Sequence, residues 1–489
     1  MDWGLGAGIL LKAVGMRHAF RVGIYSLRTG TRNGIEANRV CETGGVAKGH
    51  FGASPDTLIR VLRLSREFIW VGLGQGAAVL GSLVGLRLLT AVLAPNVYGE
   101  LALGMTLAAL VNQMALGPLC ASASRFYAPA RERGEVASFF SVLRKLFAQG
   151  TGVTLLLAVV VCLVMALARQ TKLLSLALAA FSLATLSGYG SGLDSIQNAA
   201  RQRSIVAWHQ ALGSWGRSLL AVGMIRWFGA SSTVAMLGYV LATAIVLGSQ
   251  LWFFRSIVKE ANGASAGADG TKQHWRKQVF AYAWPFAAWG GFSWAQAASD
   301  RWALQMFVST RDVGLYAVLF QLGYYPISLL SGLVVQLLSP VFYQRAGDAT
   351  DESRLGRVYH VNRLLSMATL IATGIATAFA LGFHETIFRL LVSSQYRGIS
   401  WLLPGIVLAG GLFATGQFAS ISLFSGTATH RMIIPKIASA IIGILLNVLG
   451  AVWFGVLGVV CACVVTSGIY MWWIMHLVKV RHNAVLVAQ

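Results

Sequence analysis

Three arginines stand in or at the end of long apolar stretches of this chain, where a charged side chain is costly: Arg87, Arg217 and Arg301. A guanidinium group can hold a phosphate through two parallel hydrogen bonds, so each arginine is a candidate for binding an anionic ligand. Arg87 and Arg301 lie near enough to the ends of their stretches that snorkelling to the interface, or a structural ion pair, is an open alternative for both.

Arg217 is placed deepest, near the middle of the apolar stretch 205–228. Gln210 and Ser214 fall on the same face if this stretch is a helix. Arg217 is therefore the leading single candidate for ligand binding. A structural pair with Asp194, at the end of the preceding stretch, is the open alternative.

Other residues extend this candidate site. Trp294 falls on one helical face with Arg301, and a tryptophan ring can stack on a sugar ring. Asp194 and Asp300 are the acidic residues nearest the interior of the long apolar stretches, and they are the candidates for ion coupling, in which a carboxylate binds a proton or a metal cation. For Asp300 we favour pairing with a neighbouring arginine instead. Pro326 is the candidate hinge, because a proline inside a helix removes a backbone hydrogen bond and bends the helix.

Twelve apolar stretches must position these residues. The length of each stretch is close to the roughly 20 residues that a helix needs to cross the hydrocarbon core of a membrane. The chain of 489 residues has 56% hydrophobic and 11% charged residues and a mean hydropathy of +0.66, which is typical of a membrane protein. Lipid cannot satisfy an exposed strand edge, so we expect helices. The expected spans are residues 68–93, 99–119, 146–168, 173–192, 205–228, 233–254, 279–299, 316–338, 364–383, 402–424, 437–454 and 456–477.

Basic residues alternate between the loops that join these spans. Most of the 39 Lys and Arg residues lie before the first span, after the last span or in every second loop. The other loops hold six of them: Arg169, Lys172, Arg226, Arg311, Arg389 and Arg397. Since cytoplasmic loops carry the excess of Lys and Arg, we expect both termini in the cytoplasm. An anionic inner leaflet explains the net charge of +22, and we expect no nucleic-acid binding.

The two halves of the chain resemble each other. A shift of 214 residues aligns Arg87 with Arg301, and one inserted residue then aligns Gly99 with Gly314. We therefore expect an all-α polytopic membrane protein of 12 transmembrane helices, in two six-helix lobes related by a pseudo-two-fold axis along the membrane normal.

Five segments follow from this organisation. Residues 1–66 are a basic N-terminal extension that we expect to be disordered, and residues 67–255 are the N-lobe with helices 1–6. Residues 256–278 include a Gly/Ala/Ser-rich stretch and are expected to form a cytoplasmic linker. Residues 279–478 are the C-lobe with helices 7–12, and residues 479–489 are a cytoplasmic tail.

Motifs for enzymatic chemistry are missing from the sequence. It has no Walker loop, HExxH, GxSxG or paired-carboxylate motif, and the five cysteines show no metal-ligand spacing. We therefore expect a protein that is not an enzyme, with no catalytic residues, no bound metal and no cofactor.

Three segments carry a resemblance to a known family: RLLTAVLAPNVYGELAL at 87–103, RFYAPARERGE at 125–135 and SDRWALQMFVSTRDVGLYA at 299–317. Over about residues 65–480 the chain resembles the polysaccharide transporter branch of the MOP (MATE-like) exporter superfamily. The resemblance implies two lobes that rock about a central, often cationic cavity. It also implies a Wzx-type flippase that turns undecaprenyl-pyrophosphate-linked oligosaccharides across the bacterial inner membrane for O-antigen, capsule or exopolysaccharide synthesis.

The partners implied are the lipid-linked oligosaccharide, membrane lipids, and a polysaccharide polymerase with its chain-length machinery. Two alternatives stay open. A MATE-type multidrug exporter, or an exporter of another lipid-linked precursor, belongs to the same superfamily, but a drug exporter usually needs a buried carboxylate and none is evident at mid-membrane. A membrane glycosyltransferase or polymerase generally has a large periplasmic loop, whereas the longest outer loop here spans residues 384–401.

Overall fold

The computed structural model describes residues 55–167, 171–262, 269–346, 352–425 and 433–487. The chain divides into two units, Met1–Leu62 and Arg63–Gln489. In the first unit the described residues, 55–62, are helical, and the rest of the expected N-terminal extension up to residue 54 lies outside the described residues. The second unit is described below by itself.

Every regular element in the described ranges is a helix. In chain order the elements are α3 (Pro55–Val92), α4 (Pro95–Val111), the π-helix η2 (Asn112–Leu116), α5 (Gly117–Glu132), α6 (Val136–Leu167), α7 (Thr171–Ala199), α8 (Arg203–Phe228), α9 (Ser232–Asn262), α10 (Asp269–Phe307), α11 (Thr310–Ala346), α12 (Glu352–Leu391), the 3₁₀-helix η3 (Ser394–Leu402), α13 (Leu403–Ser425) and α14 (Ile433–Val487). Nine segments of the described residues are helices long and apolar enough to cross a membrane. The protein is therefore a multi-pass membrane protein.

Proline and glycine mark several helix boundaries. Ala94 has an extended backbone, and Pro95 follows it at the start of α4, where its missing N–H is not needed. Gly229 ends α8 with a φ of 97°. Gly455 has a φ of 58° inside α14 and divides it into the arms 433–454 and 456–487, which correspond to two expected spans.

Helices α8 and α10 do not belong to these nine apolar segments. The polar residues at their centres explain why: α8 carries Gln210 and Arg217, and α10 carries Gln296, Asp300 and Arg301. A helix that faces a polar cavity instead of lipid does not need to be apolar all round. Lower hydropathy is therefore expected of the helices that build a polar site.

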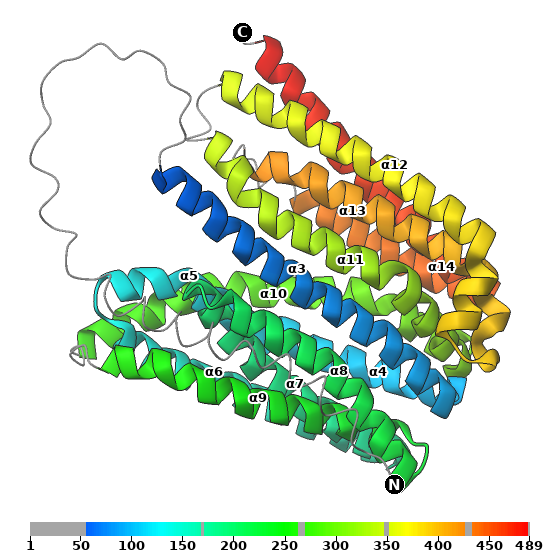
Figure 1. Ribbon diagram of the computed structural model, residues 1–489. Helices are drawn as coiled ribbons and strands as arrows, with labels where there is room; N and C mark the ends of the chain where they lie inside the picture. The colour runs from blue at the N-terminus through cyan, green and yellow to red at the C-terminus, as the bar shows by residue number, and fades with distance from the viewer. Residues whose placement is uncertain (1–54, 168–170, 263–268, 347–351, 426–432, 488–489) are drawn as a thin grey trace, which may run out of the picture. The chain divides into compact units, whose positions relative to one another are not determined.

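The helices pack in two groups (Figure 1). Helices α5, α6 and α9 pack on α7, and α8 packs on α9, whereas α11, α12 and α14 pack on α13. The groups meet where α4 packs on α11. Helix α10 packs on α14 and also on α5 and η2, so it touches both groups.

A glycine from each group lets α4 and α11 cross closely. A Cβ on Gly99 would collide with the carbonyl oxygen of Thr310, and a Cβ on Gly314 would collide with the carbonyl oxygen of Pro95. Small residues of this kind let helix backbones touch in membrane proteins. The alignment that pairs Gly99 with Gly314 also pairs Pro95 with Thr310, so this contact is reciprocal.

Helices extend into the segments expected as linker and tail. Helix α9 runs to Asn262 and α10 begins at Asp269, so the expected linker 256–278 is helical except for residues 263–268, which lie outside the described residues. Helix α14 reaches Val487, within the expected tail. These helices therefore continue past the apolar stretches that predict them.

Trp275 explains why α10 begins before its apolar stretch. Its side chain is fully buried, and its indole Nε1 donates a hydrogen bond to Oε2 of Glu135 at 2.9 Å. The ring also packs edge-on against Phe139, with 5.4 Å between ring centroids. These contacts fix the start of α10 on the turn between α5 and α6.

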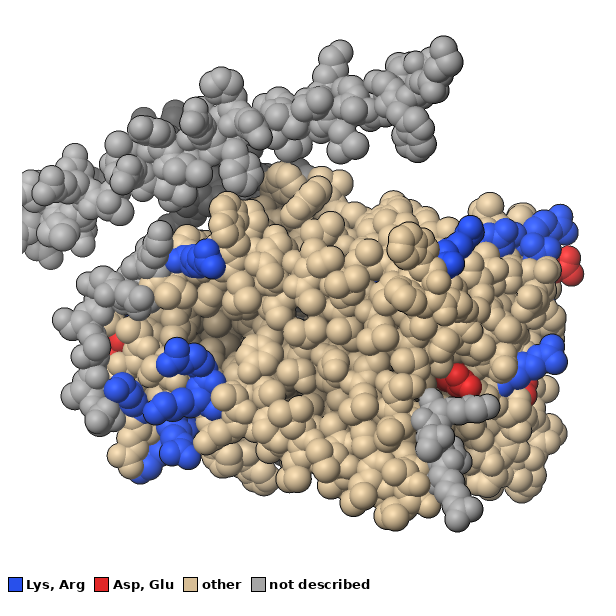
Figure 2. All heavy atoms as spheres, turned by 90° about the horizontal axis from the view of Figure 1, so that it is seen from below, with Lys and Arg blue, Asp and Glu red and all other residues tan. Residues whose placement is uncertain are grey.

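Charged side chains avoid the middle of the face seen in Figure 2. Lys and Arg gather toward its two ends, with a broad band of uncharged residues between them. Large apolar side chains are exposed elsewhere on the unit as well, among them Leu155, Leu156 and Val159 of α6. Such a surface is unfavourable in water and suited to lipid.

Candidate functional site

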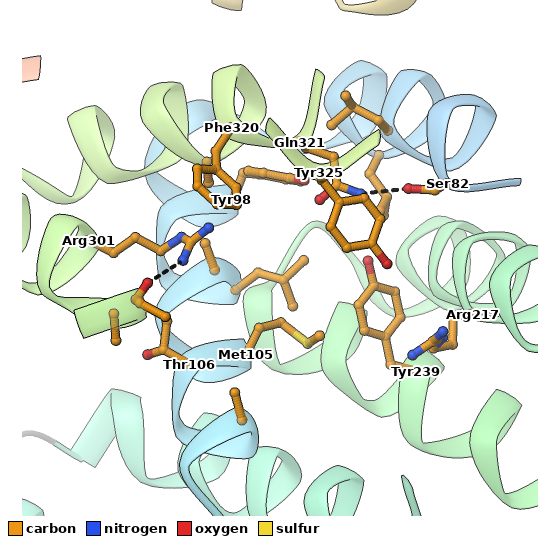
Figure 3. Close-up of a pocket in the computed structure, with 18 of the residues that line it drawn as sticks. Ser82, Tyr98, Met105, Thr106, Arg217, Tyr239, Arg301, Phe320, Gln321 and Tyr325 are labelled. Carbon is orange, nitrogen blue, oxygen red and sulfur yellow. Dashed lines mark hydrogen bonds between the residues drawn. The ribbon is translucent and has the colours of Figure 1, made fainter. Parts of the chain in front are cut away.

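A cavity of about 390 Å³ lies inside the second unit, bounded by α3, α4, η2 and α8 to α11. We call it the arginine cavity, because Arg217 and Arg301 line it from opposite sides (Figure 3). The described residues of its lining include no acidic side chain, so the lining carries two positive charges and no negative one. Its polar and aromatic lining residues are Ser82, Tyr98, Thr106, Gln113, Ser214, Arg217, Ser218, Tyr239, Trp294, Arg301, Phe320, Gln321 and Tyr325.

Arg217 lies on α8, and among the described residues it makes only a local hydrogen bond. Its Nε donates to the carbonyl oxygen of Gly213, one turn earlier, at 3.1 Å. The alternative partner Asp194 instead accepts a hydrogen bond from Nε2 of Gln250 on α9. Within the described part of the chain, the structure shows no carboxylate paired with Arg217. Its charge is therefore left for a ligand in the cavity.

Arg301 lies on α10 and has a carboxylate neighbour. Its Nη1 is 3.8 Å from Oδ1 of Asp300, and its guanidinium carbon lies 4.8 Å from the centroid of the Phe320 ring. Asp300 is 4% exposed and also accepts hydrogen bonds from the hydroxyl of Tyr316 at 2.8 Å and from the backbone N–H of Arg301 at 2.6 Å. Asp300 therefore pairs with the neighbouring arginine and positions it.

Arg87 does not join the other two arginines. Its Nη1 donates to the backbone carbonyl oxygen of Val392, directly after the end of α12. A cation suits that position, because the last carbonyls of a helix lack partners within the helix. Arg87 lines neither of the cavities described here, although it aligns in sequence with Arg301.

Trp294 lines the arginine cavity and is fixed to the opposite helix. Its indole Nε1 donates to the carbonyl oxygen of Thr106 on α4 at 2.7 Å, and Nε1 of Trp302 donates to the Thr106 hydroxyl at 3.0 Å. A ring held in this way keeps a fixed orientation beside Arg301 without losing further side-chain freedom on binding.

Asp194 lies away from both cavities. Asp194 accepts the hydrogen bond from Gln250 described above. A second pair of amides forms a hydrogen bond in the same helix group, from Nε2 of Gln75 to Oε1 of Gln210 at 2.9 Å. The bond between Gln250 and Asp194 joins α9 to α7, and the bond between Gln75 and Gln210 joins α3 to α8. Asp194 therefore lines neither cavity, and within the described residues the structure shows no ion pair between Asp194 and an arginine.

A second cavity of about 370 Å³ adjoins the first and is lined by residues of η2, α10, α11, α13 and α14. We call it the C-terminal cavity. Gln113, Ala297 and Phe320 line both cavities. The other polar and aromatic residues of its lining are Trp289, Ser293, Gln296, Asp300, Tyr324, Phe413, Gln417, Lys436, Ser439, Asn447, Thr466, Ser467 and Tyr470.

The tyrosines of the arginine cavity are a feature that sequence reasoning missed. Tyr98, Tyr239 and Tyr325 line it from three helices, and Figure 3 shows the hydroxyl ends of Tyr239 and Tyr325 pointing toward one another. Aromatic residues are frequent in membrane helices for packing, so type and spacing alone do not single these out. Pro326 directly follows Tyr325, and α11 continues through it.

Chemically, the arginine cavity is suited to an anion. Arg217 is half-buried and has no described carboxylate partner, and such a cation is unfavourable until a negative charge approaches it. Guanidinium groups on two sides could hold two oxyanion groups at once, and the surrounding hydroxyl and amide groups could complete their hydrogen bonds.

Comparison with known proteins is consistent with this geometry. The family model described as polysaccharide biosynthesis protein matches residues 64–346. No curated protein matches the chain in sequence.

Solved structures match it in fold. The inward closed conformation of the lipid II flippase MurJ has a TM-score of 0.64 at 13% identity, with 84% of this chain and 87% of that chain covered. An inward-facing multidrug resistance MATE family transporter of the MOP superfamily has a TM-score of 0.60 at 12% identity, with 84% and 95% covered.

A MOP superfamily transporter from Pyrococcus furiosus, reported to have a binding pocket of reverse polarity, has a TM-score of 0.54 at 14% identity, with 87% and 96% covered. The family match and the shared fold confirm the resemblance seen in the sequence. The chain belongs to the polysaccharide biosynthesis protein family and has the fold of the MOP superfamily transporters.

Proposed function

We propose that this protein is a flippase that moves undecaprenyl-pyrophosphate-linked oligosaccharide units across the membrane for surface polysaccharide synthesis. One observation carries the proposal: Arg217 and Arg301 line one cavity between the two helix groups, the described lining includes no acidic residue, and Arg217 has no described carboxylate partner. A pyrophosphate group supplies the missing negative charge and can accept bidentate hydrogen bonds from both sides. Membership in a polysaccharide family supports the glycan part of this substrate.

Trp294 completes the proposed substrate site. The ring lines the same cavity as Arg301, so it can stack on the sugar nearest the pyrophosphate. Arg87 is the third cavity cation expected from the sequence, and its contact with Val392 supports a structural role instead. The polyprenyl tail stays in lipid beside the cavity.

Twelve spans in two lobes form the proposed transport machine, with both termini in the cytoplasm. Counting α8, α10 and the two arms of α14 beside the other apolar segments supports this number. Residues 67–255 and 279–478 are the proposed lobes. The reciprocal contact of Gly99 with Thr310 and of Gly314 with Pro95 supports a pseudo-two-fold axis between α4 and α11, since equivalent residues meet at such an axis.

Transport then proceeds by alternating access. The glycine crossing of α4 and α11 holds the lobes together at one end, and rocking of the lobes opens that end and closes the other. Pro326 is the proposed hinge, because it lies within α11 next to the cavity residue Tyr325.

Asp300 is the proposed site of ion coupling, with Asp194 as the second candidate. Protonation of Asp300 would remove its attraction for Arg301 and so link the charge of the carboxylate to the position of the guanidinium.

The proposed location is the bacterial inner membrane. A polysaccharide polymerase and its chain-length machinery are the proposed partners, because they use the transported unit. A MATE-type multidrug exporter is the competing function, and its support is the shared fold alone. The positive lining of the arginine cavity disfavours cationic drugs. A glycosyltransferase or polymerase is disfavoured, because the structures similar in fold are transporters and flippases.

Deletion of the gene tests the proposal. Lipid-linked oligosaccharide should accumulate on the cytoplasmic face, and a surface polysaccharide should disappear. Restoration by the full chain completes the test. Normal surface polysaccharide in the deletion strain, together with increased sensitivity to cationic drugs, would favour the exporter instead.

A further inference from the structure

The two cavities differ in charge although they share part of their walls. The arginine cavity has two arginines and, in its described lining, no acid, whereas the C-terminal cavity has one acid, Asp300, and one base, Lys436. Phe320 belongs to both walls, and Figure 3 shows it beside Arg301. A ligand with an anionic group and an uncharged group can therefore occupy both cavities at once.

Stacked aromatic rings form one wall of the C-terminal cavity. Phe320 and Tyr324 are stacked with 4.6 Å between ring centroids, and Phe413 and Tyr470 are stacked with 5.1 Å between them. The ring centroids of Tyr324 and Phe413 are 6.1 Å apart, so the two stacked pairs are neighbours. These rings come from α11, α13 and α14. A continuous aromatic wall of this kind suits the apolar face of a ring-shaped ligand.

Three residues of the same cavity have polar atoms without a hydrogen-bond partner. Within the described part of the chain, Oδ1 of Asn447, Oγ1 of Thr466 and the hydroxyl of Tyr470 are buried and unpaired. Buried polar atoms of this kind are unfavourable and rare unless something absent from the chain itself completes them. The carbonyl needs a donor, whereas the hydroxyl groups accept and donate.

We propose that the C-terminal cavity binds an uncharged sugar ring of the glycan while the arginine cavity holds the pyrophosphate. A sugar has apolar C–H faces for the aromatic wall and hydroxyl groups that both donate and accept, which matches the three unpaired atoms. The cavity of about 370 Å³ falls within the range of roughly 300–1,000 Å³ typical of small-molecule sites. The inference rests on the proposed function and adds where the glycan lies.

The double variant Thr466→Val with Tyr470→Phe tests this site. Both changes remove an unpaired hydroxyl and keep the shape of the side chain, so folding should not suffer. Thr377→Val is the matched control, because the hydroxyl of Thr377 is also buried and unpaired but lies outside both cavities. Thermal unfolding of each full-length variant verifies that the fold is kept.

Two lipids are compared as ligands of the detergent-solubilised full chain. One is the glycolipid extracted from the deletion strain, and the other is undecaprenyl pyrophosphate without sugar. The wild type should bind the glycolipid more tightly. The double variant should bind the glycolipid about 5- to 100-fold more weakly, as expected for two lost hydrogen bonds, with unchanged affinity for the sugar-free lipid. The Thr377 variant should behave like the wild type.

Other outcomes overturn the inference. If the double variant binds the glycolipid as tightly as the wild type, water completes these hydroxyl groups and the cavity is not a sugar site. Equal wild-type affinity for the two lipids also overturns it, while leaving the proposed function in place. Binding of neither lipid by the wild type refutes the proposed function itself.

Discussion

Replacing Arg217 should weaken binding of the pyrophosphate without weakening the fold. Its hydrogen bond to the carbonyl oxygen of Gly213 is local, and no described carboxylate is paired with it. Arg217→Ala therefore leaves no buried partner charge behind. This differs from Arg301→Ala, which would leave Asp300 buried without its cation and should lower the melting temperature as well as the affinity.

The size of the effect follows from the bonds that are lost. Two charge-assisted hydrogen bonds to a phosphate contribute about 1.5 kcal/mol each at the low end of the usual range, so Arg217→Ala should lose about 3 kcal/mol. This corresponds to a weakening of affinity on the order of 100-fold. Arg217→Lys keeps the charge and loses the bidentate geometry, so about half of that free energy, or roughly tenfold in affinity, should be lost.

Binding of undecaprenyl pyrophosphate to the purified full-length variants measures these values. Arg226→Ala is the matched control, because Arg226 is an exposed arginine in the last turn of the same helix and should bind like the wild type. Transport in the deletion strain should follow the same order. If both the Ala and the Lys variants of Arg217 bind and transport normally, the assignment of this arginine to the substrate site is wrong.

Three further predictions concern the scaffold. Gly99→Val should abolish transport by separating α4 from α11, measured as lost complementation of the deletion strain, whereas Gly76→Val should complement because a Cβ there meets nothing within 4 Å. Arg87→Ala should lower the melting temperature through loss of its bond to a carbonyl after α12 while ligand affinity stays unchanged, and a selective loss of affinity would contradict this. Trp275→Phe should destabilise the protein by about 1–3 kcal/mol by leaving half-buried Glu135 without its donor, and an unchanged melting temperature would show that this contact does not fix α10.

Much of the fold is predictable from the sequence because the bilayer imposes strong constraints. Length and apolarity predict the spans, and a helix is required wherever the backbone meets lipid. Arg217 and Arg301 are recognisable for the same reason, since a charge in such a stretch is unusual. The duplicated pattern also aligned Gly99 with Gly314, which the structure brings into direct contact.

Long-range contacts account for what the sequence does not predict. In sequence, Arg87 has the same local surroundings as a cavity cation, and its partner Val392 comes from a distant part of the chain, directly after α12. Trp275 lies in a polar, Gly-poor segment after a flexible-looking stretch, and its burial depends on the distant turn that carries Glu135. Such pairings leave no periodic pattern in either segment.

The C-terminal cavity illustrates the same limit for the candidate site. Asn447, Thr466 and Tyr470 are ordinary polar residues of membrane helices, where they usually bond to another helix. Only the structure shows that each has an atom without a partner among the described residues and that all three line one cavity.

Reconstituted transport tests the central claim most directly. The full-length protein is placed in liposomes that contain the glycolipid extracted from the deletion strain, and a glycosidase that cannot cross the membrane is added outside. With the wild type, the glycan of the inner leaflet should become accessible and be cleaved, while liposomes with Arg217→Ala should keep it protected. An inner-leaflet fraction that stays equally protected with and without the wild-type protein would contradict the assignment as a flippase.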